Sequence, residues 1–275
     1  MFGSILGDIA GSRFEFSRPK GFNWRTEALF APNCRYTDDT VMSIATKYAI
    51  LTECSYESAY RSFGRRYPHA GYGSMFQEWL TSGTRRPYQS CGNGSAMRAG
   101  VIGEYFDTLE QVEQEAAKSA RCTHNHPEGI IGAKAAAAGV FLARSGFSKK
   151  EIRRTIEKRY GYFLMIPLAA RRPFSRIRLT CQETMPLAFT CFLESTDFES
   201  CIRNVFSCLC DTDTVGCIAG AVAEAYYHET GFDNDALLKQ YLIKPLAVGQ
   251  ADTFLYDWAT AKKISTKERG VPIDC

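Results

Sequence analysis

Glycines recur at four-residue spacing in two segments near opposite ends of the chain. Gly3, Gly7 and Gly11 form one series, and Gly216 and Gly220 form the other. Residues four apart lie on one face of an α-helix, so each series predicts a helix with a face of small residues. Such helices can bring their backbones close together inside a crowded bundle. The same spacing occurs in dimerising membrane helices, but the acidic residues beside both series exclude that alternative.

Helical signals continue through the rest of the chain. Capping boxes begin at Thr108 and Ser148, and Pro127 suits the first position of a helix whose small residues run over 132–143. Apolar patterns predict further helices over residues 40–53, 55–67, 184–194, 197–209, 214–230 and 234–247. Alternating strand patterns, linkers and repeats are almost absent. We therefore expect an all-α fold, a single compact multi-helix domain over residues 1–275 with about a dozen short helices.

Composition narrows the class of protein. The chain is 45% apolar, which is ample for a large core, and its formal net charge is only +3. Its arginine pairs are scattered, unlike the basic stripe of a nucleic-acid-binding protein. Eleven cysteines lack zinc-site spacing, which favours a reduced, cytoplasmic protein. No stretch of about 20 apolar residues is present to span a membrane. The oligomeric state stays open, with a monomer favoured.

Two short acidic segments lie far apart in the chain. They are Thr37-Asp38-Asp39-Thr40 and Asp211-Thr212-Asp213-Thr214, and an apolar helical pattern follows each. Acids at a helix start are often only capping residues. Carboxylate and hydroxyl oxygens are also the ligands that hard divalent cations prefer, and two such clusters could hold two ions about 4 Å apart. The repeated pattern favours a metal site, and capping remains compatible with it.

Three other segments carry polar groups suited to ligand binding. The turn Gly92–Arg98 exposes backbone N–H groups that favour an anion, although an ordinary tight turn has the same composition and the Lys of a P-loop is missing. His124 and His126 precede a helix, either as ligand contacts, metal ligands or acid/base groups, or as a helix cap. Asp8 and Glu15 lie seven residues apart, so we expect both on one face of the first helix.

These five segments together, in this order, resemble the ADP-ribosylglycohydrolase family. They read Gly-Asp-x-x-Gly-Ser-x-x-Glu, Thr-Asp-Asp-Thr, Gly-Asn-Gly-Ser-Ala-Met-Arg, Thr-His-x-His-Pro-Glu-Gly and Asp-x-Asp-Thr. The resemblance runs from Gly3 to about Tyr227. It implies an all-α fold with a site for two ions of Mg²⁺ or Mn²⁺. It also implies a hydrolase that cleaves the glycosidic bond of an ADP-ribosyl group.

The resemblance also implies roles for individual residues. By matching position, the metal ligands are expected to be Thr37, Asp38, Asp39, Asp211, Asp213 and Thr214. The residues expected to position the attacking water or take its proton are Glu15, Asp38 and Asp39. The residues expected to contact the ADP-ribose are Ser90, Cys91, Gly92, Asn93, Gly94 and His124. The expected partner is an ADP-ribosylated protein or a small ADP-ribosyl substrate, and a nucleic-acid acceptor stays open.

One position departs from the family pattern. The family usually has two glycines before the second acidic segment, where this chain has Leu209 and Cys210. Side chains at these positions are expected to crowd the approach to the second metal or its substrate. The alternative function is therefore a catalytically weakened ADP-ribose-binding or structural protein on the same fold. A hydrolase of free ADP-ribose derivatives is a third possibility.

Overall fold

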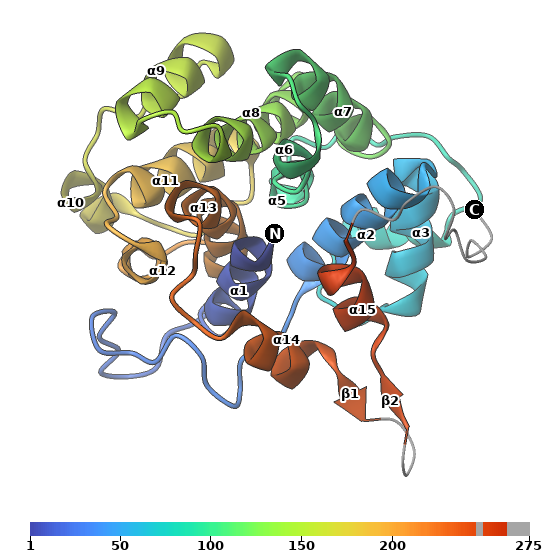
Figure 1. Cartoon of the computed structure of the whole chain (residues 1–275), viewed down its shortest axis with the longest axis horizontal. Helices are drawn as coiled ribbons and strands as arrows, with labels where there is room; N and C mark the ends of the chain where they lie inside the picture. The colour runs from blue at the N-terminus through green and yellow to red at the C-terminus, as the bar shows by residue number, and fades with distance from the viewer. Residues whose placement is uncertain (246–249, 263–275) are drawn as a thin grey trace.

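The computed structural model describes residues 1–245 and 250–262, and helices dominate it (Figure 1). In chain order the elements are α1 (Phe2–Gly11), α2 (Asp38–Thr52), α3 (Tyr56–Arg66), α4 (Ser74–Thr81), α5 (Gly94–Met97), α6 (Ile102–Tyr105), α7 (Leu109–Arg121), α8 (Pro127–Arg144), α9 (Lys149–Tyr160), α10 (Leu168–Arg171), the 3₁₀ helix η1 (Arg172–Phe174), α11 (Cys181–Leu193), α12 (Phe198–Phe206), α13 (Thr212–Tyr227), α14 (Asn234–Leu242), β1 (Lys244–Pro245), β2 (Ala251–Asp252) and α15 (Phe254–Thr260). The two strands pair antiparallel, with Lys244 opposite Asp252. The expected all-α fold is confirmed.

Helices α1 and α13 pack together through their glycine faces at the centre of the molecule (Figure 1). A Cβ atom on Gly7 would lie 2.1 Å from the carbonyl oxygen of Gly216, and one on Gly11 would lie 2.3 Å from that of Thr212. Only glycine permits so close an approach of two backbones. The two helices run antiparallel, so the end of α1 lies beside the start of α13. This pairing brings residues 12–15 to the second acidic segment.

Each helix predicted from patterns is present. Both capping boxes form, at Thr108 and at Ser148, and Pro127 is the first residue of α8. The boundaries differ from the predicted ones by a few residues. Pattern analysis did not identify α4, α5, α6, α10 and α15, which are four to eight residues long. Helices this short contain too few turns for an apolar periodicity to stand out.

Two boundary predictions need correction. Asp8 and Glu15 do not share a helix face, because α1 ends at Gly11. The Ser12 hydroxyl donates to the carbonyl of Ile9 and accepts from the backbone N–H of Arg35, so this side chain competes with continuation of the helix. The predicted helix over 234–247 ends at Leu242, where β1 follows. Residues 246 and 247 lie outside the described residues.

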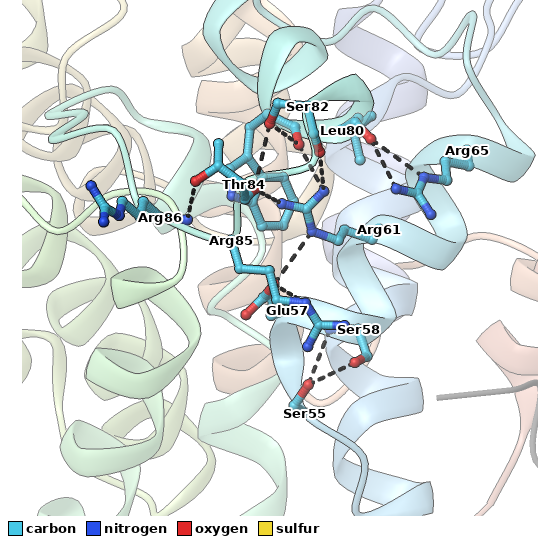
Figure 2. A network of polar contacts seen from close by, with 11 residues as sticks. Ser55, Glu57, Ser58, Arg61, Arg65, Leu80, Ser82, Thr84, Arg85 and Arg86 are labelled. Atoms are coloured by element: carbon cyan, nitrogen blue, oxygen red, sulfur yellow. Dashed lines mark hydrogen bonds and ion pairs between the residues drawn. The ribbon is translucent and has the colours of Figure 1, made fainter.

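A network of arginines joins α3 to α4 and to the segment after it (Figure 2). Buried Arg61 donates hydrogen bonds to the carbonyl oxygens of Trp79 (2.8 Å), Ser82 (3.4 Å) and Thr84 (2.5 Å). Its guanidinium carbon also lies 3.9 Å from the centre of the Trp79 ring. Arg65 donates to the carbonyl of Leu80. Arginine side chains therefore donate to the carbonyls at the end of α4 that have no partner within the helix, and these bonds hold α4 against α3.

Within the described residues, no helix is both long and apolar enough to cross a membrane.

Candidate metal centre

A cavity of about 370 Å³ opens where several loops and helix starts meet. Both acidic segments, the glycine-rich turn and the start of α4 border it. The lining residues are Glu15, Phe16, Asp38, Asp39, Met42, Gly71, Tyr72, Gly73, Ser74, Met75, Phe76, Tyr88, Ser90, Gly92, Asn93, Gly94, Met97, Arg98, His124, Leu179, Asp211, Asp213 and Thr214. Segments more than 170 residues apart in sequence thus share one cavity.

The first acidic segment is fixed by Asp8 of α1. The Asp8 carboxylate accepts hydrogen bonds from the backbone N–H of Thr37 (2.9 Å) and of Thr40 (3.1 Å), and from both threonine hydroxyls. The Thr37 hydroxyl in turn accepts from the backbone N–H of Asp39, as a helix cap does. Capping therefore occurs here. It also sets the direction in which Asp38 and Asp39 leave the start of α2.

The second acidic segment begins α13, but Asp211 does not cap that helix through its side chain. The Asp211 carboxylate instead accepts a hydrogen bond of 2.6 Å from Asn93, which belongs to the glycine-rich turn. The Thr214 hydroxyl donates to the Asp39 carboxylate at 3.2 Å, so the two acidic segments touch directly. Simple capping does not account for this arrangement.

The carboxylates form two groups that share Asp213. In each group, one carboxylate oxygen from every member lies within 4.8 Å of the others. Asp8, Asp39 and Asp213 form the first group, and Glu15, Asp211 and Asp213 form the second. Glu15 reaches this position from the turn after α1. Two adjacent groups of hard oxygen donors suit two divalent cations.

Burial and mutual repulsion raise the pKa values of these acids. Burial raises the pKa of Asp38 to about 8, and the charge of Asp8 adds to that rise. Burial raises the pKa of Glu15 to about 7, helped by the charge of Asp211. Burial, and then the charge of Asp39, raise the pKa of Asp213 well above its usual value. Crowded buried carboxylates of this kind are stabilised by a bound cation.

Protein cations do little to compensate this charge. Among the described residues, the ion pair that reaches these carboxylates joins Arg35 to Glu15 at 4.0 Å, and Arg35 is exposed. One buried oxygen of Asp39, Oδ1, has no hydrogen-bond partner among the described residues. A buried carboxylate oxygen without a partner is costly unless a ligand meets it. The residues present thus fit a metal site by charge, donor type and an unpartnered donor atom.

The glycine-rich turn lies against His124. A Cβ atom on Gly94 would lie 3.1 Å from His124 Nε2, so this ring borders the turn directly. The other ring nitrogen, Nδ1, forms a hydrogen bond of 2.8 Å with the Thr123 hydroxyl. Burial, and then the charge of Arg98, lower the pKa of His124 well below its usual value. The imidazole is therefore neutral at neutral pH. It can form hydrogen bonds to a ligand but does not offset the negative charge of the carboxylates.

The other predicted substrate residues surround the same turn. Ser90, Gly92, Asn93 and Gly94 line the cavity, and the Ser90 hydroxyl accepts from the backbone N–H of Gly92. Cys91 does not line it, and its carbonyl accepts from the backbone N–H of Cys181. The side-chain amide of Asn93 is bonded to Asp211 and to Thr184, so this residue joins the turn to the acidic cluster.

His126 and Leu209-Cys210 lie outside the cavity lining. His126 caps α8 by accepting from the backbone N–H of Glu128, which confirms the capping alternative for this histidine. The Leu209 side chain is 42% exposed, and Cys210 is buried. Neither side chain borders the carboxylates from the cavity side. The expected crowding of the second metal position by these two residues is absent from the cavity.

Several lining residues were not anticipated from the sequence. The aromatic rings of Phe16, Tyr72, Phe76 and Tyr88 border the cavity. The buried Tyr72 hydroxyl has no hydrogen-bond partner within residues 1–245 and 250–262. Nothing in the local sequence distinguishes these rings from the other aromatic residues of the chain. Asp8 was noted for its spacing, but its hydrogen bonds to the first acidic segment depend on helix packing.

Comparisons with known proteins agree with one another. A family model described as ADP-ribosylglycohydrolase matches residues 1–255. The chain is 29% identical over 310 residues to ADP-ribosylhydrolase ARH3 of Homo sapiens, covering 82% of this chain and 83% of that protein. It is 28% identical over 270 residues to ADP-ribosylhydrolase ARH3 of Mus musculus, covering 74% and 71%. A solved chain described as an ADP-ribosylglycohydrolase-related protein complex shares the fold, with a TM-score of 0.67, 22% identity and coverage of 82% of this chain and 84% of that one.

Proposed function

Because this chain belongs to the ADP-ribosylglycohydrolase family, we propose that it is a metal-dependent hydrolase that removes ADP-ribose from a protein or related acceptor. The observation that carries the metal part of this proposal is the pair of carboxylate groups that share Asp213. We take residues 1–275 as a single domain of this family. A monomer and a cytoplasmic location stay predictions from the sequence.

The two ions, Mg²⁺ or Mn²⁺, would be held by Thr37, Asp38, Asp39, Asp211, Asp213 and Thr214. When bound, such ions orient the hydroxyls of a ribose and lower the pKa of a water molecule. The structure supports this assignment through the unpartnered Oδ1 of Asp39 and through the shared position of Asp213. Asp8 belongs to the first carboxylate group and also holds Thr37, whereas Asn93 would act from outside by holding Asp211.

Carboxylates of the protein would orient the attacking water and take its proton. Glu15 is half-buried and lines the cavity beside Asp211 and Asp213, a position that suits a group that takes a proton from water. The water oxygen forms a bond to the anomeric carbon while the bond from that carbon to the acceptor breaks. The proton taken from water passes to the departing acceptor. Asp38 and Asp39 are the neighbouring groups able to orient the same water.

The rest of the cavity would hold the ADP-ribose. The glycine-rich turn Ser90–Gly94 lies against neutral His124, and a diphosphate would lie beside this turn and ring. The aromatic rings of Tyr72 and Phe76, which also line the cavity, offer a stacking surface to adenine. The cavity volume of about 370 Å³ is within the range of small-molecule sites.

The test is release of ADP-ribose from an arginine-ADP-ribosylated protein, with Mg²⁺ or Mn²⁺ and then with a chelator. We expect metal-dependent release, and serine and nucleic-acid linkages are assayed in parallel to find the acceptor. Release that persists in chelator contradicts the metal assignment. If ADP-ribose binds, as calorimetry would show, but no linkage is hydrolysed, the alternative of a weakened ADP-ribose-binding protein replaces the proposal.

A further inference from the structure

The connection between α9 and α11, which includes α10 (Figure 1), exposes an unusual number of large apolar side chains. Six of the ten large hydrophobic side chains that are exposed within the described residues lie in residues 163–179. They are Phe163 (60% exposed), Met165, Ile166, Phe174 (81%), Ile177 and Leu179. Exposed Leu209 adjoins them, because its backbone N–H donates to the Ser175 hydroxyl at 3.0 Å. We call residues 163–179 with Leu209 the 163–179 surface. Apolar side chains gathered in this way mark interaction sites.

The charge of this surface is one-sided. Residues 161–180 contain four arginines, Arg171, Arg172, Arg176 and Arg178, and no lysine, aspartate or glutamate. Enrichment in Phe, Met and Arg with depletion of Lys, Asp and Glu is the composition of protein–protein interfaces. A nucleic-acid surface would use lysine as well and would stack bases on aromatic rings, whereas most apolar groups here are aliphatic. The composition therefore favours a protein partner with acidic and apolar side chains.

The four arginines fall into two pairs with different surroundings. Arg171 donates to the carbonyls of Phe163 and Ile166, and Arg172 donates to the Ser207 hydroxyl. These bonds hold the segment in one conformation. Arg176 is exposed and makes no hydrogen bond or ion pair with the part of the chain that the structure describes. Arg178 forms an exposed ion pair with Glu183 at 3.1 Å, and such a pair contributes little to stability. Arg176 and Arg178 therefore remain available to a partner.

A hollow of about 290 Å³ lies within this surface. Ile166, Phe174, Arg171, Arg176 and Arg178 border it, together with Glu183, the ion-pair partner of Arg178, so arginines outnumber the acid in the hollow. The surface also reaches the candidate metal centre, because Leu179 lines the cavity and its carbonyl accepts from the backbone N–H of Asn93 at 2.8 Å. A macromolecule seated on the hollow would thus continue toward the cavity that holds the carboxylates.

We propose that the 163–179 surface docks the protein acceptor of the ADP-ribosyl group, through a segment with acidic and apolar side chains. Its carboxylates pair with Arg176 and Arg178, and its apolar side chains fill the hollow beside Phe174. The inference rests on the proposed function for the identity of the attached group. It adds that recognition includes the acceptor's flanking sequence as well as the ADP-ribose.

The experiment compares three substrates that share one ADP-ribosyl linkage, the one that the wild-type protein hydrolyses. One is the free ADP-ribosylated amino acid, one is a peptide with Asp, Glu, Leu and Phe flanks, and one is a peptide with Lys and Ser flanks. The test variant combines Phe174→Ser with Arg176→Glu. The matched control combines Phe147→Ser with Arg154→Glu, which also removes an exposed phenylalanine and reverses an exposed arginine, on a different part of the molecule.

We expect wild-type protein and the control variant to have a kcat/KM roughly tenfold or more higher for the acidic-apolar peptide than for the basic one. The test variant loses this preference, while kcat/KM for the free amino acid derivative is unchanged in all three proteins. Equal loss on the free derivative, retention of the preference or a preference for the basic peptide overturns the docking proposal. The proposal is also overturned if sedimentation shows that wild-type protein is a dimer and the test variant a monomer. It is likewise overturned if wild-type protein prefers a nucleic-acid-linked substrate and the test variant loses that preference.

Failure of the proposed function gives a different pattern. If wild-type protein hydrolyses none of the three substrates at any linkage, the enzymatic proposal fails. Docking is then decided by fluorescence anisotropy with the same two peptides, labelled and without ADP-ribose. Tighter binding of the acidic-apolar peptide that the test variant loses and the control variant keeps supports docking, and equal binding of both peptides overturns it.

Discussion

Asp213 is the residue on which both carboxylate groups of the cavity depend. It lies in the first turn of α13 and is 3% exposed. Its carboxylate oxygens lie within 4.8 Å of oxygens of Asp39 and of Glu15. Burial raises its pKa well above the usual value, so the fold places it at a cost in free energy. Residues kept in such positions commonly serve function at the expense of stability.

Replacing Asp213 with Asn should separate function from stability. The variant keeps the shape of the side chain but removes its charge. Loss of a group that only hydrogen-bonds to a metal ligand already costs about 10- to 100-fold in activity. We therefore expect kcat/KM for ADP-ribose release to fall at least about 100-fold when a ligand itself is changed. The metal-free variant should be at least as stable as wild type, because a repelled buried charge is gone. Activity and Mn²⁺ binding by calorimetry measure the first effect, and thermal unfolding in chelator the second.

The exposed Asp107→Asn variant is the control, with wild-type values expected for both quantities. Near-normal turnover by Asp213→Asn contradicts the assignment of Asp213 as a metal ligand.

Helix contacts determine whether the two acidic segments meet. The starts of α2 and α13 are brought together by α1, which contacts both (Figure 1). The contact of α1 with α13 leaves no room for a Cβ atom at Gly7, and Asp8 follows directly. Helix packing and site geometry are therefore linked through adjacent residues.

The Gly7→Ala variant should destabilise the fold strongly. Its Cβ atom would lie 2.1 Å from the carbonyl oxygen of Gly216, and a helix backbone cannot move aside as a side chain can. Overpacking of this kind costs about 1–3 kcal/mol or more, and we expect the upper end of that range by urea unfolding. The control is Gly83→Ala, where nothing lies within 4 Å. Equal stability of the two variants would show that α1 and α13 are not in contact as described.

The position of α4 depends on Arg61. An Arg61→Met variant keeps the length of the side chain but removes the guanidinium donor from the carbonyls of Trp79, Ser82 and Thr84 (Figure 2). The Ser82 hydroxyl remains as a donor to the carbonyl of Trp79 or of Thr84. A lost partner of a buried polar group costs about 1–3 kcal/mol, so we expect a loss of this size in unfolding free energy. We also expect a raised KM, because Ser74, Met75 and Phe76 of α4 line the cavity.

Arg86→Met serves as the control, because Arg86 is exposed and contributes a backbone bond to this network. An unchanged KM in Arg61→Met, with the expected loss of stability, would mean that α4 does not form part of the substrate site.

At the scale of the whole molecule, the fold gathers negative charge into one place although the chain as a whole is slightly basic. The carboxylates concerned are Asp8, Glu15, Asp38, Asp39, Asp211 and Asp213. In the folded protein the pKa of Asp8 is about 6, that of Glu15 about 7 and that of Asp38 about 8, above the values of the unfolded chain. Between about pH 4 and pH 8 the folded state therefore binds more protons than the unfolded state, and its stability falls as pH rises.

Stability should consequently depend on pH and on divalent cations together. In chelator, we expect the unfolding free energy to decrease from pH 5 to pH 8. Mg²⁺ or Mn²⁺ at one fixed concentration, a hundred times its Kd at pH 8, adds about 2.7 kcal/mol at that pH if it binds the folded state alone. That gain should be larger at pH 8 than at pH 5, because ligand carboxylates must lose their protons. Urea unfolding at both pH values, with and without cation, measures it. A metal effect that is the same at both pH values in wild type contradicts the proposed ligands.

The sequence by itself determined the helical fold, and most of the residues that it predicted for the site line one cavity, with Thr37 and Cys91 outside that lining. Capping boxes at Thr108 and Ser148, the first-turn Pro127 and the glycine spacing act within one or two helix turns, so their effect can be read locally. The resemblance of five segments predicted the family, which the family match over residues 1–255 confirms. The roles assigned to single site residues remain predictions.

Only the tertiary structure decided how these groups meet. The end of α1 at Gly11, the bond from Asn93 to Asp211 and the contact of Thr214 with Asp39 join residues that are distant in sequence or depend on a neighbouring loop. The aromatic wall of the cavity and the exposure of residues 163–179 depend on what packs against them. Local patterns act through hydrogen bonds a few residues apart. Burial, pKa shifts and shared ligands arise when separate segments pack together, and no single segment contains that information.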